Sequence, residues 1–261
     1  MFDFLYNPKK RLKKEFVKTK DGSFTLYSSE FDECYHSTND GALNESLYKH
    51  VIPAFSFFKE KDELKILDIC FGLGFNTLTT LFYIKQNNLS KKLHIISPEF
   101  DKELVQSLRN FDYPKEFEPF KKIIYKLSSD FFYEDESVKI EILLGDAREE
   151  IKKIDTTFDI IYQDAFSPKK NPTLWTKEWF NEIKKRVHQN SIITTYSVAT
   201  NIRLSLYENG FTIYELENKN VRKATIASLN DALPLKKVDI NLKKQRNPKA
   251  KALSDKDLLK G

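Results

Sequence analysis

The stretch "LDICFGLGFN", residues 67–76, decides the fold class of this chain. It holds two of only seven glycines, Gly72 and Gly74, and they follow a strand-like run that carries Asp68. Glycine at such a place lets the backbone turn tightly and approach a ligand, whose negative end can meet the N-terminus of the next helix. The stretch therefore predicts a ligand-binding turn between a strand and a helix.

Outward from this turn, strand-like and helix-like segments alternate with short loops. Strands are expected at residues 23–28, 64–70, 92–97, 139–144, 158–163, 191–196, 211–217 and 223–229, and helices at 43–58, 75–87, 100–110, 147–153, 173–188 and 199–209. Such alternation is typical of a mainly parallel sheet with helices on both faces. Residues 111–138 fit the pattern less well and are expected to be a helical or irregular insertion.

These segments predict an α/β protein in three parts. Residues 1–60 form an N-terminal extension of short strands and a helix that packs on the core, 61–235 a Rossmann-like core, and 236–261 a basic C-terminal tail. The length of 261 residues suits one large domain with an appendage.

Composition excludes several classes of protein. No window approaches 18 consecutive apolar residues, so no membrane-spanning helix is expected, and the N-terminal sequence lacks the pattern of a secretory leader. Two cysteines cannot form a disulfide framework, and the four histidines are scattered without metal-ligand spacing. We expect a cytoplasmic protein without a metal.

The charge is unevenly distributed along the chain. Residues 9–20 and residues 236–261 each carry a net charge of +6, which leaves −7 on the remainder of a chain whose total is +5. Two basic ends on an acidic body could hold a polyanion through its phosphates, although lysine-rich ends are often simply solvated.

The class of ligand that the glycine turn binds can be inferred by elimination. A P-loop needs a Gly-Lys-Ser/Thr run, which the turn lacks, and a dinucleotide turn needs a third glycine where Thr77 stands. A nucleoside without a pyrophosphate remains. Because an acid precedes the turn, a cationic ligand is favoured, and S-adenosylmethionine (SAM) carries both an ammonium and a sulfonium.

Further acids stand at the ends of later strands. Glu99 lies 25 residues after Gly74, where a carboxylate can accept hydrogen bonds from both ribose hydroxyls, and Asp146 could accept one from the adenine amino group. Asp164 ends the next strand. Each acid alone could be a helix cap. Together with Asp68, however, four acids stand at the ends of successive strands beside the glycine turn, which favours a ligand-binding edge.

The stretch "YQDAFSPKKNPTLWTKEWF", residues 162–180, resembles the D-x-F-x-P-x-K-N-P-x-x-W-T segment of the MnmC-type tRNA wobble-uridine methyltransferases. "LDICFGLGFN" is similar to the glycine-rich turn of that family, "ISPEF" to its ribose-binding acid and "GDARE" to its adenine-side acid. "FDECYHSTNDGALNES" and "TYSVATNIRLSLYENGF" resemble further segments, so the resemblance covers most of the chain.

The resemblance implies a reaction and a set of site residues. Members use SAM to convert 5-aminomethyluridine, with or without a 2-thio group, to its methylamino form in tRNA. The implied cofactor-binding residues are Asp68, Gly72, Gly74, Asn76, Glu99, Asp146, Ala147 and Asp164. The implied substrate-binding residues are Phe166, Lys170, Asn171, Pro172, Tyr196, Arg203 and Arg222.

Asp164 is the candidate catalytic residue. An amine must be neutral to attack a methyl group, and a carboxylate can orient its nitrogen and accept its proton. Because a carboxylate also stabilises the ammonium form, orientation is expected to be its first role. Tyr35 and His36, in the family-like N-terminal segment, are candidates to fold over the SAM site, although a lone histidine is more often structural.

Two features depart from the family pattern. Cys70 stands where the family usually has the first glycine of its turn. The sequence also ends without the FAD-dependent oxidase domain of bifunctional members, so we expect a stand-alone methyltransferase linked functionally to the enzymes that install the aminomethyl group.

Three alternatives stay open: a polyamine aminopropyltransferase, a methyltransferase of small-molecule amines, and a non-catalytic protein that binds SAM or RNA. The K-N-P-x-x-W-T run argues against the first alternative. Asp164 and the two glycines of the turn argue against the last one.

Overall fold

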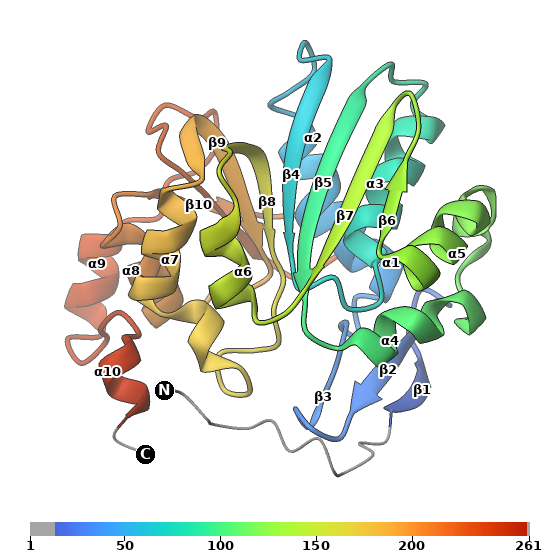
Figure 1. The fold of residues 1–261 in the computed structure, drawn as a ribbon. Coiled ribbons are helices and arrows are strands. Elements are labelled where there is room, and N and C mark those ends of the chain that lie inside the picture. Colours follow the sequence, from blue (N-terminus) through green and yellow to red (C-terminus); the bar gives the residue numbers. More distant parts are fainter. Residues whose placement is uncertain (1–13, 260–261) are drawn as a thin grey trace.

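A computed structural model describes residues 14–259 of the protein. An eight-stranded sheet, in the order β10-β11-β9-β8-β4-β5-β7-β6, forms its centre, and a separate three-stranded sheet, β1-β2-β3, lies below it in Figure 1. Residues 1–13 and 260–261, which include parts of the two basic ends, lie outside the described residues.

The central sheet is mainly parallel. Its strands are β4 (Glu63–Ile69), β5 (Lys92–Glu99), β6 (Phe132–Glu134), β7 (Val138–Leu144), β8 (Phe158–Gln163), β9 (Val187–Thr195), β10 (Thr212–Leu216) and β11 (Ala224–Ser228). β9, β8, β4, β5 and β7 run parallel, while β11 and β6 are antiparallel to their neighbours. The strand order reverses between β4 and β8, where open α/β sheets form their ligand crevice.

Helices cover both faces of this sheet. One face carries a continuous helical segment made of α1 (Ala42–Glu45), the π-helical turn η1 (Ser46–Val51) and α2 (Ile52–Phe55), together with α3 (Phe75–Gln86), α4 (Lys102–Ser107), η2 (Leu108–Asn110), η3 (Lys115–Phe120) and α5 (Lys121–Asp130). The other face carries α6 (Ala147–Lys153), η4 (Pro172–Trp175), α7 (Lys177–Lys184), α8 (Thr200–Tyr207) and α9 (Ile240–Arg246). The expected Rossmann-like fold, with helices on both faces, is confirmed.

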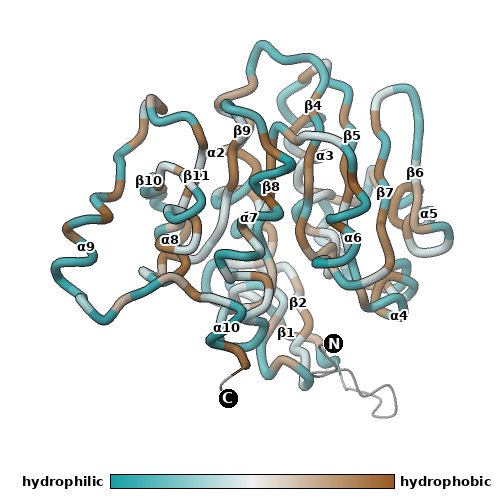
Figure 2. The backbone as a smooth tube through the Cα atoms, turned by 60° about the vertical axis from the view of Figure 1, so that its left-hand side comes forward, coloured by the Kyte–Doolittle hydropathy of each residue, from teal (hydrophilic) through white to brown (hydrophobic). Residues whose placement is uncertain are grey.

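The strands are apolar because both of their faces are buried. In β4, Leu64 and Ile66 pack into the core on one face, and Leu67 and Ile69 pack into the core on the other. Figure 2 shows the hydrophobic segments gathered along the strands and the hydrophilic ones on the outside. The sheet thereby fixes the carboxyl ends of β4, β5 and β8 at one edge.

The three-stranded sheet lies against this carboxyl edge. It consists of β1 (Lys14–Lys18), β2 (Phe24–Ser28) and β3 (Glu33–Cys34), all antiparallel. Lys14 pairs with Asp101 after β5, and the backbone N–H of Ser167, after β8, donates to Glu33. The N-terminal part therefore covers the strand ends at which a ligand is expected.

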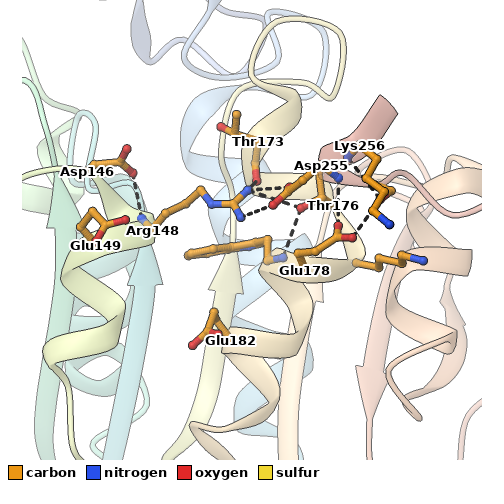
Figure 3. A network of polar contacts seen from close by, with 12 residues as sticks. Asp146, Arg148, Glu149, Thr173, Thr176, Glu178, Glu182, Asp255 and Lys256 are labelled. Atoms are coloured by element: carbon orange, nitrogen blue, oxygen red, sulfur yellow. Dashed lines mark hydrogen bonds and ion pairs between the residues drawn. The ribbon is translucent and has the colours of Figure 1, made fainter. Parts of the chain in front are cut away.

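The C-terminal segment folds back on the core and ends in α10 (Asp255–Leu258). Figure 3 shows its main attachment, a two-pronged ion pair from Arg148 of α6 to Asp255, with N–O distances of 2.8 and 2.6 Å. Arg148 also donates to the carbonyl of Thr173, and Glu178 accepts from Ser254 and from the Asp255 backbone. This network ties the C-terminus to the loop that follows β8.

Several expected boundaries differ from the structure. The helix expected at 173–188 ends at residue 184, and Val187 already belongs to β9. The insertion at 111–138 is mostly helical but ends in the short edge strand β6. The segment 236–259 is not merely a solvated tail, because Ile240 and Ala252 are buried in the core.

No helix within residues 14–259 is long and apolar enough to span a membrane. The same part of the chain contains no group of three or more His, Cys, Asp or Glu side chains placed to hold a metal ion.

Candidate active site

The turn after β4 has the left-handed backbone that its glycines predict. Gly72 has φ 55° and Gly74 has φ 73°, and a Cβ at Gly74 would lie 2.9 Å from the Phe71 ring. Cys70 is also left-handed, with φ 67°, a conformation that costs a non-glycine residue roughly 1–2 kcal/mol. The cysteine therefore preserves the shape of the turn at some cost.

Asp68 is buried next to this turn and binds the start of α3. It is 1% exposed, and it accepts hydrogen bonds from Thr77 Oγ1 at 2.8 Å and from Asn76 Nδ2 at 3.4 Å. Burial raises the pKa of Asp68 to about 7. Its carboxyl group thus joins β4 to the first turn of α3 instead of lining the cleft above.

Glu99, at the end of β5, fixes the other side of the turn. Its Oε2 accepts from the backbone N–H of Gly72 at 2.8 Å, and its Oε1 accepts from that of Asp101 at 2.8 Å. Burial raises the pKa of this carboxyl, although hydrogen bonds from the backbone N–H groups of Asp101, Gly72 and Phe100 oppose the shift. The two oxygens of a carboxylate offer about four acceptor positions, so acceptor capacity remains for a ligand hydroxyl.

A cleft opens above the turn. It is lined by six of the residues expected from the sequence, Gly72, Asn76, Glu99, Asp164, Phe166 and Asn171, and also by Tyr35, His36 and Cys70.

Asp164 reaches the cleft from the end of β8. Its Oδ2 accepts from Asn76 Nδ2 at 2.8 Å, and its Oδ1 lies 3.4 Å from Nε2 of the buried His50. Burial alone would raise the pKa of Asp164, but His50 and the hydrogen bond from Asn76 outweigh it, so the pKa lies below its usual value. The cleft therefore holds an ionised carboxylate at neutral pH.

Aromatic rings form the mouth of the cleft. Phe166 stacks on Phe31 with a centroid distance of 4.3 Å, and the ring of Tyr35 meets Phe166 edge-on at 4.8 Å. Two of these three rings come from the N-terminal part. The expectation that Tyr35 and His36 fold over the site agrees with their place in the lining.

The other expected cofactor residues lie beside the cleft, outside its lining. Gly74 caps α3 within the turn itself. Asp146 is exposed at the end of β7 and caps α6 by accepting from the backbone N–H of Arg148, and Ala147 is buried against that face of the sheet. Asp146 still shares the carboxyl edge with Glu99.

The remaining expected substrate residues serve mainly as structural contacts in this structure. Lys170 pairs with Asp32 at 2.8 Å, Pro172 begins η4, and Tyr196 donates to the carbonyl of Ala165. These contacts shape the loop after β8.

Arg203 and Arg222, two of the expected substrate-binding residues, make contacts elsewhere in this structure. Arg203 is 2% exposed, and its Nε donates to Thr225 Oγ1 of β11 at 3.0 Å, while its Nη2 is buried without a hydrogen-bond partner among the described residues. Arg222 is exposed but pairs with Asp40 of the N-terminal part at 3.0 Å. Neither residue lines the cleft.

Two residues near the Asp164 carboxylate, His50 and Thr194, could not be identified from the sequence. His50 is fully buried, and Thr194 of β9 lies 2.8 Å from its Nδ1. A histidine inside a helix-like run gives no signal of its own, since its partner stands 144 residues further along the chain.

The donor and acceptor set fits SAM. Oδ1 of Asn76 is buried without a hydrogen-bond partner, which suits a ligand ammonium or amine donor, and the Glu99 carboxylate suits ribose hydroxyls. The left-handed Gly72 lets the Tyr35 ring approach the turn closely, because a Cβ there would lie only 3.2 Å from that ring.

Replacing Glu99 with glutamine is expected to weaken SAM binding ten-fold or more. The amide keeps the size of the side chain but loses charge-assisted hydrogen bonds, which contribute about 1.5–3 kcal/mol each. Calorimetry of SAM binding measures the effect. Glu141→Gln, on the neighbouring strand β7 and paired with His94, is the matched control and should bind normally. Unchanged affinity in Glu99→Gln would remove Glu99 from the SAM site.

Comparisons with known proteins give a consistent picture. A family model described as S-adenosyl-L-methionine-dependent methyltransferase matches residues 115–230. The chain is similar to the crystal structure of MnmC2 from Aquifex aeolicus, with a TM-score of 0.82 and 34% identity, covering 97% of this chain and 82% of that one.

Curated relatives are longer than this chain. An uncharacterized protein from Methanocaldococcus jannaschii is 35% identical over 215 residues, which are 80% of this chain and 58% of the relative. The bifunctional tRNA 5-methylaminomethyl-2-thiouridine biosynthesis protein MnmC of Campylobacter fetus is 28% identical over 221 residues, which are 80% of this chain and 35% of the relative. The chain thus spans about one third to three fifths of these two relatives.

Proposed function

The chain belongs to the MnmC2-type S-adenosyl-L-methionine-dependent methyltransferases, and from this we propose that it acts on the wobble uridine of tRNA. In this reaction the amine of 5-aminomethyluridine, with or without the 2-thio group, receives the methyl group and becomes 5-methylaminomethyluridine. That the protein is a SAM-dependent methyltransferase confirms the family, cofactor and enzyme class predicted from residues 67–76 and 162–180.

One observation carries the proposal: an ionised Asp164 stands in the SAM cleft beneath an aromatic mouth. Bound SAM supplies an electrophilic methyl group on a sulfonium. Asp164 can then hold the amine nitrogen in line with that group, and positioning of this kind supplies much of the catalysis of a displacement reaction. The same carboxylate can accept the proton that the amine must lose.

The carboxylate of Asp164 must orient the substrate amine without strongly stabilising its unreactive ammonium form, and its two partners in the structure help with this. Asn76 and His50 already face the two oxygens of Asp164, so these contacts partly balance its negative charge before the substrate binds. The ammonium form is then stabilised less than it would be by a free carboxylate. Phe166, with Phe31 and Tyr35, offers an aromatic face for a base turned out of its stack.

The surface beside α8 supports an RNA substrate. A groove of about 620 Å³ lies between the start of α8 and residues 247–257, and Lys249 and Lys251 line it. The neighbouring α9 carries Lys243, Lys244 and Arg246 in its last turn. Since α8 follows the carboxyl end of β9, the groove lies on the same side of the sheet as the cleft. Basic side chains there suit the phosphates of a tRNA.

The alternatives are less well supported. The polyamine and small-molecule readings leave the basic groove without a role, and a non-catalytic protein would not need an ionised carboxylate in the cleft. Action on tRNA would place the protein in the cytoplasm and link it to the enzymes that install the aminomethyl group.

The function is tested by incubating tRNA that carries 5-aminomethyluridine with SAM and the protein, followed by mass spectrometry of the digested nucleosides. The expected product gains one methyl group on the side-chain amine. Putrescine with decarboxylated SAM is the parallel reaction for the polyamine alternative and should give no product. Absence of methylated uridine, with SAM binding intact, would refute the proposed substrate.

A further inference from the structure

His50 is a buried histidine directly behind the catalytic carboxylate. It lies in the π-helical turn η1, is 0% exposed, and reaches toward β8 and β9. Its Nδ1 lies 2.8 Å from Thr194 Oγ1, and its Nε2 lies 3.4 Å from Asp164 Oδ1. The edge of the ring faces Tyr162, with centroids 5.7 Å apart. Three sides of the imidazole are thus fixed by the strands that carry the site.

The Nε2 atom of His50 has no hydrogen-bond partner within standard geometry among the described residues. Leaving such a buried group unpaired costs about 1–3 kcal/mol, so natural proteins keep few of them without a role. Asp164 is the acceptor toward which Nε2 is directed, at a distance slightly too long for a well-formed bond. Hydrogen bonds of catalytic groups are often long before the substrate binds and shorten afterwards.

The contact with Thr194 defines the tautomer that this arrangement needs. When the threonine hydroxyl donates to Nδ1, the ring proton is on Nε2 and faces Asp164. Asn76 faces the other oxygen of the same carboxylate. His50 and Asn76 together then hold Asp164 by both oxygens and leave its remaining lone pairs to the cleft.

We propose that His50 is a positioning residue for Asp164, which directs the carboxylate toward the substrate amine and keeps it ionised in a buried cleft. This inference rests on the proposed function, because it assigns His50 a role in the same amine methylation. A proton on Nε2, directed at Oδ1 from 3.4 Å, stabilises the charged form, which burial alone would disfavour. His50 itself does not touch the substrate.

Other titratable groups surround the pair. The groups that face it are Asp68 of β4, His36 of the N-terminal part, Tyr162 of β8, Tyr196 after β9, Cys70 of the turn, and Glu45 and Lys49 of the helical segment. Glu45 and Lys49 pair with each other at 2.7 Å. Burial raises the pKa of Asp68 to about 7, so Asp164 is the carboxyl that stays ionised below neutral pH.

Removing the imidazole of His50 is expected to change the pKa of Asp164 in one direction. Without His50, burial is opposed less strongly, and the pKa of Asp164 rises. The ionised form is then lost at a higher pH as the solution is acidified. The acid limb of the pH dependence of kcat/KM should therefore move to higher pH, which a purely structural histidine would not cause.

The kinetic test compares His50→Gln and Thr194→Val with the wild type, using tRNA that carries 5-aminomethyluridine. For His50→Gln we expect kcat to fall about ten-fold or more, the acid limb to move upward, and SAM affinity to stay within about two-fold. Thr194→Val should also move the acid limb of the pH profile to higher pH, by a smaller amount. His188→Gln is the matched control, because His188 pairs with Asp159 at 2.9 Å at the opposite ends of β8 and β9, and it should behave as wild type.

A spectroscopic measurement covers the case in which His50→Gln does not fold. In the ligand-free wild-type protein, the ¹⁵N NMR signals of His50 should report a proton on Nε2, and Asp164→Asn should shift them. This readout needs no substrate, so it tests the His50–Asp164 contact even if the proposed tRNA reaction fails. An active wild type with an unmoved acid limb in both His50→Gln and Thr194→Val would overturn the inference. A His50 proton on Nδ1 alone would also overturn it.

Discussion

Asp164→Asn is expected to lower kcat by about 100-fold or more while leaving SAM affinity within about three-fold. The substitution preserves the size of the side chain and an oxygen that can accept from Asn76, so the cleft keeps its shape. It removes the negative charge that we propose to orient the amine and accept its proton. Single-turnover methyl transfer with labelled SAM measures the rate, and calorimetry measures the affinity.

The control for this substitution is the same change at an exposed aspartate. Asp155 lies in the loop before β8, at the end of that strand opposite to the cleft, and Asp155→Asn should turn over normally. If Asp164→Asn were to retain a rate within a few-fold of the wild type, Asp164 would not be at the reacting atoms. Loss of SAM binding in parallel with the rate would assign Asp164 to the cofactor instead.

The central strands are predictable from the sequence because burial on both faces makes them continuous apolar runs. Asp68 is the next-to-last residue of β4, Glu99 ends β5 and Asp164 directly follows β8, so parallel topology brings the three acids to one edge. The short edge strands β1, β3 and β6 carry no such signal. They are held by pairing with neighbours, which a single sequence does not reveal.

The boundary after α7 was not predictable for a related reason. Trp179, Ile183 and Val187 stand at helical spacing and all three are buried. An apolar period of four continues through the end of the helix into β9, so the pattern alone does not separate the two elements. The structure ends α7 at residue 184 and begins β9 at residue 187.

At the site, the pattern identifies strand ends but not the direction of their side chains. Asp68 and Asp164 both stand at such ends, yet Asp68 turns toward Thr77 and Asp164 toward the cleft. Arg203 follows its family-like segment at the expected position, but packing of α8 buries it. Directions of this kind depend on contacts between residues far apart in the chain.

Binding of the tRNA substrate is expected to weaken about 50- to 150-fold between 50 and 200 mM salt, if four phosphates are neutralised. Each contact releases condensed counterions, with a slope of about 0.7–0.9 log units per log unit of salt. Four side chains of the segment 243–249 lack an acidic partner among the described residues: Lys243, Lys244, Arg246 and Lys249. Kinetics of tRNA methylation at several salt concentrations measure the slope.

Charge-neutralising variants test whether these side chains are the source of the slope. Deleting residues 236–261 would also remove the buried Ile240 and Ala252, so Lys243→Ala with Arg246→Ala and Lys249→Ala is the cleaner variant. It should reduce the slope by about two to three units. Lys126→Ala, on the exposed face of α5, should leave the slope unchanged. Free 5-aminomethyluridine carries no phosphates for the basic segment to bind, so it should be a poor substrate at any salt. If the free nucleoside were methylated as efficiently as tRNA, without salt dependence, a methyltransferase of small-molecule amines would replace the tRNA enzyme as the better account.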